Sequence, residues 1–440
     1  MVFFATESML TRLLRVLEHR TGIGEVMPAL DSVRTIAIAL VFGFHAHAFS
    51  GTPSLPLGPQ GPDLAHLLQS GFLGVDLFFV LSGFLLILPW ARAFYLGRPF
   101  PSPMGYYRRR ILRIAPAYYA HLLVLFLVLV PWVYGLSFLL SGEGAWHVLA
   151  HAFFLQFLFP GTATGLGING ALWTLTIEAQ FYLILPFVAP YFLGRRAWLG
   201  LGAALGIAIA WKALTAWVLA DMALAVMEKT HPLWYDPFST LAYAYPLPMV
   251  QMFLDNQFPA QAFHFAIGMA CGNLYASHRY GRSTMPWMEG YPGGLMGLLA
   301  GATLLWMAWT LDQLDMALGF WRHAWHPLFA LACALFILSL AFPNPLSRLF
   351  SRPALRLPGI VSYSLYLWHV PIFFLVFHHL YPLDLDGPWA FIYMAALCGS
   401  LAMAIAFLSY LLIEKPFMAR REVIKRPALE NLPGRVPGTG

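Results

Sequence analysis

Charged residues are scarce in this sequence. Aspartate, glutamate, lysine and arginine make up only 10% of the 440 residues, whereas they make up about a quarter of a typical soluble domain. The three cysteines, Cys271, Cys333 and Cys398, lie in apolar segments and lack the close spacing of a metal site or redox pair. We interpret them as packing residues. The low charge excludes a disordered chain and argues against a soluble core.

Hydrophobic residues are abundant instead, at 59% of the chain with a mean hydropathy of +0.67. A helix needs about 20 mostly apolar residues to cross a hydrocarbon core about 30 Å thick. The sequence therefore predicts an all-α polytopic membrane protein with about ten transmembrane helices, at 30–49, 71–91, 114–135, 171–193, 197–219, 258–277, 290–311, 325–343, 359–381 and 388–413.

The apolar segment 146–160 is too short to cross, and the basic residues support this interpretation. If it does not cross and both termini are cytoplasmic, all but four of the 26 lysines and arginines lie inside or in the two terminal segments, as the positive-inside rule requires. If 146–160 crossed the membrane fully, every later segment would change sides, and the basic residues after it would lie outside. We therefore predict a short re-entrant or interfacial helix here. Membrane orientation also explains the isoelectric point near 9.2, so we expect no nucleic-acid partner.

Three regions follow from this pattern. Residues 1–28 form a cytoplasmic amphipathic segment, because Leu10, Leu13, Leu14 and Leu17 share one helical face. Residues 29–417 form the transmembrane domain. Residues 418–440 form a flexible basic cytoplasmic tail, rich in proline and glycine.

Ionisable residues within membrane spans are expensive and often functional, which draws attention to Arg34 and His45 in the first span. Eleven residues separate them, so their side chains share one helical face about 16 Å apart along the axis. Arg34 would lie near the cytoplasmic entry and His45 in the outer half. The alternative is that Arg34 reaches the inner headgroups and His45 is an ordinary hydrogen-bonded residue of the bundle.

Three other spans carry candidate residues. Glu178 is expected at a depth similar to that of His45, where it would orient the imidazole; alternatively it satisfies backbone or hydroxyl groups. Asp76 opens the second span as a site residue or as a carboxylate favoured by the helix dipole. His369, mid-span before a proline, either lines a cavity or caps a freed carbonyl. Ser82 and Gly83 are more typical of close helix packing than of chemistry.

Two clusters of side chains at helical spacing complete the candidate set. Arg110 and Arg113 lie on one face of a helix at the inner end of the third span and either grip phosphates or supply ordinary positive-inside charge. His147 and His151 have the spacing of metal ligands, but no third ligand is evident, so we predict no metal site.

Taken together, these residues make the chain resemble the bacterial membrane acyltransferase family 3. The resemblance extends from about residue 29 to 417, with the motifs in the family's order. It rests on Leu30 to Arg34 leading to His45 in an Arg-x10-His pattern, Gly74 to Phe84, Arg110 to Pro116 with Arg-x-x-Arg, Trp173 to Tyr182, Ser362 to Pro371, and Glu414 to Pro416. Ser32 stands where many relatives have glycine.

The resemblance implies an O-acyltransferase that moves an acyl group, usually acetyl, from cytoplasmic acyl-CoA to a hydroxyl of an extracytoplasmic or lipid-linked glycan. It implies His45 as the catalytic histidine, assisted by Arg34 and Glu178. Arg110, Arg113 and Arg34 would contact acyl-CoA, a co-substrate rather than a tightly bound cofactor. We predict Asp76, Trp173 and His369 as substrate-binding residues. The expected location is a bacterial inner membrane.

Two points stay open at the level of sequence. The outer loop 220–257 holds aromatic and acidic residues that suit a sugar acceptor or an interfacial aromatic belt, namely Trp234, Tyr235, Asp236, Tyr243 and Tyr245. A transporter or flippase using the intramembrane arginine, histidine and glutamate residues as a path is the alternative function. The oligomeric state is not predicted.

Overall fold

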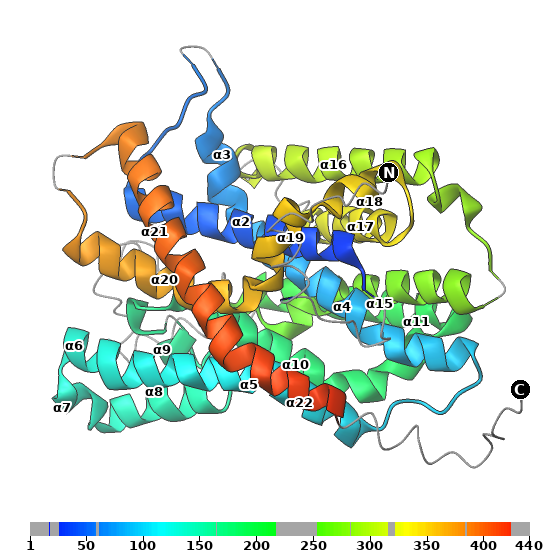
Figure 1. The fold of residues 1–440 in the computed structure, drawn as a ribbon, viewed down its shortest axis with the longest axis horizontal. Coiled ribbons are helices and arrows are strands. Elements are labelled where there is room, and N and C mark those ends of the chain that lie inside the picture. Colours follow the sequence, from blue (N-terminus) through cyan, green and yellow to red (C-terminus); the bar gives the residue numbers. More distant parts are fainter. Residues whose placement is uncertain are drawn as a thin grey trace, which may run out of the picture.

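The structure is a computed structural model that describes residues 17, 26–58, 61–163, 165–216, 253–281, 283–315, 322–382 and 385–423. Within these ranges it is a bundle of helices, and the helix α21 with its continuation α22 crosses the others obliquely (Figure 1). Eight helices are long and apolar enough to cross a membrane, or nine if one bent pair is counted as a span. The predicted all-α multi-pass membrane fold is confirmed.

The helices of the first half of the chain begin with α2, the helix that carries Arg34 and His45. In chain order they are α2 (Pro28–Ser50), α3 (Leu64–Gln69), η1 (Ser70–Leu73), α4 (Gly74–Tyr95), α5 (Pro103–Val124), η2 (Leu125–Leu129), α6 (Val130–Tyr134), α7 (Leu136–Leu139), α8 (Gly142–Ala152), α9 (Pro160–Ala163), η3 (Gly165–Gly167), η4 (Gly170–Leu172), α10 (Trp173–Val188), η5 (Ala189–Phe192), η6 (Gly194–Arg196) and α11 (Ala197–Leu214). Some consecutive helices are continuous with one another, so that Leu64–Tyr95 and Pro103–Tyr134 each form one long span.

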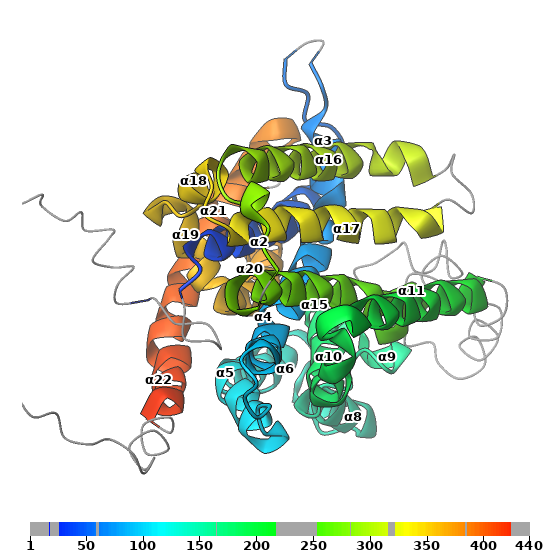
Figure 2. The same ribbon diagram turned by 90° about the vertical axis from the view of Figure 1, so that its right-hand side faces the viewer.

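The second half contains α15 (Phe258–Tyr280), η9 (Pro286–Met288), α16 (Tyr291–Asp315), α17 (Arg322–Ala341), α18 (Pro345–Phe350), α19 (Pro353–Ile360), α20 (Ser362–His379), α21 (Gly387–Ser409), η11 (Tyr410–Glu414) and α22 (Lys415–Val423). The helices α19 and α20 form the bent pair, with an angle of 67° between them. In Figure 2, α16, α17 and α15 lie in successive layers above α10 and α8.

The sixth predicted span, 258–277, is the helix α15, which is not among the eight apolar candidates. Its polar residues explain why: Gln261, His264 and Asn273 are all buried against neighbouring helices. The helix is thus a central element of the bundle, enclosed by α4, α11 and α17. Burial by protein rather than by lipid accounts for its lower apolar content.

The contact between α4 and α15 depends on glycine. A methyl group added at Gly83 would lie 2.1 Å from the carbonyl oxygen of Phe265, and one added at Gly268 would lie 2.0 Å from that of Val80. The two backbones can therefore touch only because these positions lack a side chain. The prediction that Gly83 serves close helix packing is confirmed.

The segment predicted to be re-entrant or interfacial lies beside the third span. The helix α8 is followed by a turn in which Phe154 has a positive φ of 58°. The Tyr118 hydroxyl, about halfway along the Pro103–Tyr134 helix, donates a 2.7 Å hydrogen bond to the carbonyl of His151. The segment therefore enters the bundle and does not form a separate crossing, in line with the prediction.

Parts of the two terminal predictions and of the outer-loop prediction fall outside the described residues. In the amphipathic segment 1–28, Leu17 is buried and its carbonyl accepts a hydrogen bond from Tyr410. The last helix continues to Val423, beyond the expected domain boundary at residue 417. The aromatic residues of the loop, Trp234, Tyr235, Asp236, Tyr243 and Tyr245, lie outside the described ranges.

Candidate active site

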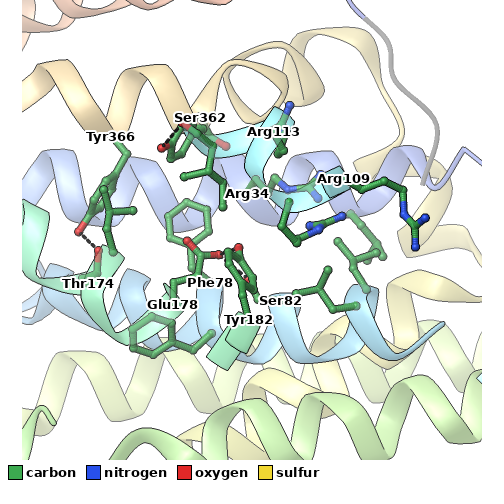
Figure 3. A pocket seen from close by; sticks show the side chains of 18 of the residues that line it. Arg34, Phe78, Ser82, Arg109, Arg113, Thr174, Glu178, Tyr182, Ser362 and Tyr366 are labelled. Carbon is green, nitrogen blue, oxygen red and sulfur yellow. Dashed lines mark hydrogen bonds between the residues drawn. The ribbon is translucent and has the colours of Figure 1, made fainter. Parts of the chain in front are cut away.

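A cavity of about 200 Å³ lies between α2, α4, α5, α10 and α20. It runs along α4 from Val75 to Trp90 and includes residues near the starts of α2, α5, α10 and α20. In Figure 3, Arg34, Arg109 and Arg113 lie toward one end, Tyr366 and Thr174 lie at the other, and Glu178, Tyr182 and Ser82 lie between them. The cavity therefore has a cationic end and a hydroxyl-bearing end.

Four arginines line this cavity, but their charges are compensated to different degrees. Arg34 pairs with Asp31 at 3.0 Å, and Arg113 lies 3.5 Å from the buried carboxylate of Glu414. Arg110 stacks over the rings of Tyr106 and Tyr182, each 5.9 Å from the guanidinium carbon. No carboxylate pairs with Arg109 or Arg110 within the described residues.

The two carboxylates that pair with these arginines, Asp31 and Glu414, also connect helices to one another. Asp31 accepts hydrogen bonds from Nε and Nη2 of Arg356, at 3.3 and 3.1 Å, which fixes α19 against α2. Glu414 accepts a 2.5 Å hydrogen bond from Ser364, which joins η11 to α20. Among the described residues, Arg109 and Arg110 are therefore the lining arginines whose guanidinium groups can bind an anion. The parallel N–H groups of a guanidinium match the spacing of phosphate oxygens.

Glu178 lies in the middle of the cavity. Its carboxylate accepts a hydrogen bond from the Tyr182 hydroxyl, one helical turn further along α10, and a 3.3 Å hydrogen bond from Ser82 on α4. The alternative that Glu178 satisfies hydroxyl groups is therefore part of its observed role. Glu178 makes no contact with His45 among the described residues, so the structure does not support direct orientation of that imidazole.

His45 lies further along α2 and is held by its own helix. Its Nδ1 donates a 2.9 Å hydrogen bond to the carbonyl of Val41. Because a carbonyl can only accept, Nδ1 carries the proton in the neutral ring and Nε2 carries the lone pair. The ring packs edge-to-face on that of His369, with 4.9 Å between centroids. The geometry leaves His45 partly exposed with a basic nitrogen available.

Tyr366 lines the cavity and also adjoins His369. Its hydroxyl makes 2.7 Å hydrogen bonds to Thr174 and to the carbonyl of Ala171, and its ring lies 5.5 Å from that of His369. Arg34 and Glu178 line the cavity, whereas His45 and His369 are not among its lining residues. Ring contacts connect the cavity to His45 through Tyr366 and His369.

The three predicted substrate-binding residues lie in three different places. His369 is buried beside His45, and its Nδ1 donates to the carbonyl of Tyr366 at 2.8 Å, whereas the Leu367 carbonyl that Pro371 frees accepts from Asn169. Trp173 packs on Phe157, with 5.0 Å between ring centroids. Asp76 lies away from the cavity, against His264 on α15. The lining of the cavity includes none of the three.

Several lining residues were not predicted. Tyr182 lies one helical turn after Glu178, and Tyr366 lies one turn before His369. Residues three or four positions apart share a helical face, so this spacing from a predicted residue indicates that both tyrosines face the same site. Arg109 lies within the basic cluster but was not singled out. Asp31 and Glu414 lie within quoted motifs, yet their ion pairs with distant arginines could not be inferred from one sequence.

A membrane-spanning bundle that encloses four arginines around a half-buried carboxylate, with two facing imidazoles on α2 and α20, suits an integral membrane enzyme. Comparison with known proteins then identifies the family. The chain belongs to the acyltransferase 3 family, because that family's model, described as an acyltransferase domain, matches residues 27–411. It is therefore a multi-pass membrane acyltransferase, and the predicted resemblance is confirmed.

Individual relatives agree with this assignment. The chain is 26% identical, over 88% of its length and 81% of the relative's, to BcsY of Komagataeibacter xylinus, provisionally named a membrane-bound transacylase. It is 24% identical over 89% of its length to the O-acetyltransferase OatA of Staphylococcus aureus (strain NCTC 8325 / PS 47). It covers 57% of OatA, so it spans little more than half of that protein. No solved structure matches the chain.

Proposed function

We propose that this protein transfers an acyl group, acetyl in the first instance, from cytoplasmic acyl-CoA to a hydroxyl group of a glycan on the other side of a bacterial inner membrane. The observation that carries the proposal is one cavity that combines four arginines with the half-buried carboxylate of Glu178. The relatives add the acceptor class, because OatA is named an O-acetyltransferase and a relative from Bacillus subtilis is provisionally named for peptidoglycan O-acetylation.

The arginine end of the cavity suits the phosphates of CoA. Arg109 and Arg110 have no carboxylate partner in the part of the chain that the structure describes, and charge-assisted hydrogen bonds from guanidinium to phosphate are among the stronger polar contacts in proteins. This end faces the side where α2, α5 and α20 begin, which is the cytoplasmic side under the positive-inside rule. We therefore assign the donor to the cytoplasmic side and expect its acyl arm to extend past Glu178 toward Tyr366.

His45 is suited to act as the general base. With Nδ1–H committed to Val41, the lone pair of Nε2 can accept the proton of the acceptor hydroxyl as its oxygen attacks the thioester carbonyl. The carbon–sulfur bond then breaks, and the CoA thiolate takes up a proton from the imidazolium. A covalent acyl-histidine intermediate is a second route that uses the same nitrogen.

The thioester and His45 must meet for either route, and ring contacts through Tyr366 and His369 connect the cavity to His45. Rotation of Tyr366 would break its hydrogen bonds to Thr174 and Ala171 and join the cavity to the space beside His369. Such aromatic gates move on timescales compatible with turnover. We infer that Tyr366 controls passage of the acyl arm, while Glu178 keeps Tyr182 and Ser82 in place along the path.

Incubation of the purified protein with acetyl-CoA labelled in the acetyl group tests the proposal. We expect thioester hydrolysis without an acceptor and label transfer when glycan fragments are added. A transporter or flippase would move substrate without consuming acetyl-CoA. Absence of both hydrolysis and transfer, in protein that still binds CoA, would refute the proposed donor chemistry.

A further inference from the structure

Three side chains outside the cavity converge near the starts of α4, α15 and α17. The Oδ2 atom of Asp76 lies 3.6 Å from Nε2 of His264 and 3.6 Å from Nδ1 of His326. One ligand atom from each residue lies within 4.8 Å of the other two. Asp76 and His264 are buried, whereas the side chain of His326 is 31% exposed. The cluster is therefore enclosed but reachable at one edge.

Oδ2 of Asp76, Nε2 of His264 and Nδ1 of His326 meet only as 3.6 Å ion pairs, which are too long for hydrogen bonds, and Nδ1 of His264 has no partner among the described residues. Buried polar groups in folded proteins are nearly always satisfied, and an unsatisfied one indicates a bound water or ion. Several buried polar atoms without good hydrogen bonds in one place destabilise the folded protein. One ion bound by all three side chains at the centre of the cluster would satisfy these atoms.

We propose that Asp76, His264 and His326 bind a divalent transition-metal ion, zinc in the first instance. Zinc takes imidazole nitrogen and carboxylate oxygen at about 2.0–2.2 Å, and a tetrahedral site then places neighbouring ligand atoms about 3.4 Å apart. The observed 3.6 Å separations are close to this value, so small side-chain movements complete the site. Three protein ligands leave a fourth position for water. The same ligand set also suits iron(II).

This metal site is separate from the cavity. Val75, Phe78 and Ser82 point from α4 into the cavity, whereas Asp76 points from the same helix toward α15 and α17. The ion therefore joins three helices in the half of the bundle opposite the arginines and stabilises their packing. The Lys212 ammonium acts electrostatically on His326 and opposes a cation here, which lowers the expected affinity.

Zinc titration of the full-length protein tests this proposal independently of acyl transfer. The protein is purified in detergent with an affinity tag that contains no histidine, stripped with a chelator and desalted. Competition with a zinc-responsive dye and elemental analysis then give affinity and stoichiometry. We expect one zinc ion per chain and a higher thermal unfolding temperature with zinc than without it.

Variants locate the ion. Asp76→Asn and His326→Gln should each weaken zinc binding by at least about 100-fold, because loss of even an outer-shell partner costs 10- to 100-fold. His326 lies at the exposed edge, so its replacement disturbs packing least. His147→Ala is the matched control, since it removes another buried histidine and should leave zinc binding unchanged. Wild-type protein that takes up no stoichiometric zinc or iron(II), or a His326→Gln variant that binds like wild type, would overturn the proposal.

Discussion

His45 combines the features that a general base needs, a fixed tautomer and an available lone pair. Replacement by alanine removes the proton acceptor, so we expect His45→Ala to lower kcat for acetyl transfer by about 10²- to 10⁴-fold. The measurement is label transfer from acetyl-CoA to a glycan acceptor. His47→Ala, two residues along the same helix and facing elsewhere, is the control. Full activity in His45→Ala would eliminate the scheme.

Arg110 offers a test of donor binding that is separate from the chemistry. It lines the cavity and pairs with no carboxylate of the described ranges. Arg110→Gln should therefore raise KM for acetyl-CoA by about 10- to 100-fold, which corresponds to one lost hydrogen bond to a charged group. Arg108→Gln is the matched control, since Arg108 is exposed and lies outside the cavity lining. Equal effects of the two variants would show that general positive charge, rather than the cavity, attracts the donor.

Tyr366 allows the proposed gate to be examined at the same scale. Tyr366→Phe keeps the ring but removes the hydrogen bonds that hold it to Thr174 and Ala171, so the ring should move more freely. We expect acetyl-CoA hydrolysis without an acceptor to rise about 2- to 10-fold, because a loss of about 0.5–1.5 kcal/mol from the closed state is a typical net value for such a bond. Unchanged hydrolysis would mean that the ring is not the barrier.

At the scale of elements, the α4–α15 contact brings Asp76 beside His264 and positions Ser82 toward Glu178. Because a methyl group at Gly83 would meet the Phe265 carbonyl, Gly83→Ala should force the helices apart and lower the free energy of unfolding by about 1–3 kcal/mol. Thermal unfolding in detergent measures this. Gly202→Ala on α11, where an added methyl group meets no atom within 4 Å, should unfold as wild type does. Equal stability of both variants would argue against this tight packing.

At the scale of the whole molecule, the proposal requires a defined orientation in the membrane. In a variant without the three native cysteines, Leu57→Cys should react with an impermeant maleimide in intact spheroplasts, whereas Arg98→Cys should react only after permeabilisation. Both positions are exposed, and the positive-inside rule places Arg98 in the cytoplasm. The opposite labelling pattern would invert the assigned sides for donor and acceptor.

Much of the fold was predictable because the bilayer imposes a length and a composition on each span. Apolar runs predicted most of the helices, including α20 but not α19 or the bend between them, and basic residues predicted that 146–160 does not cross. The helix α15 shows the limit of this approach. Its segment was found, but its central burial was not, because one sequence does not reveal whether an apolar face meets lipid or protein.

The sequence by itself determined the family and the helices that carry Arg34, Glu178, Arg110 and Arg113, because motif order and helical spacing are local properties. Only the tertiary structure decided which side chains meet. It joined the four residues in one cavity whose lining does not include His45. It also brought Asp76 close to His264 and His326, which lie about 190 and 250 residues later in the chain. Such contacts depend on how α4, α15 and α17 pack, and packing is set by the whole bundle.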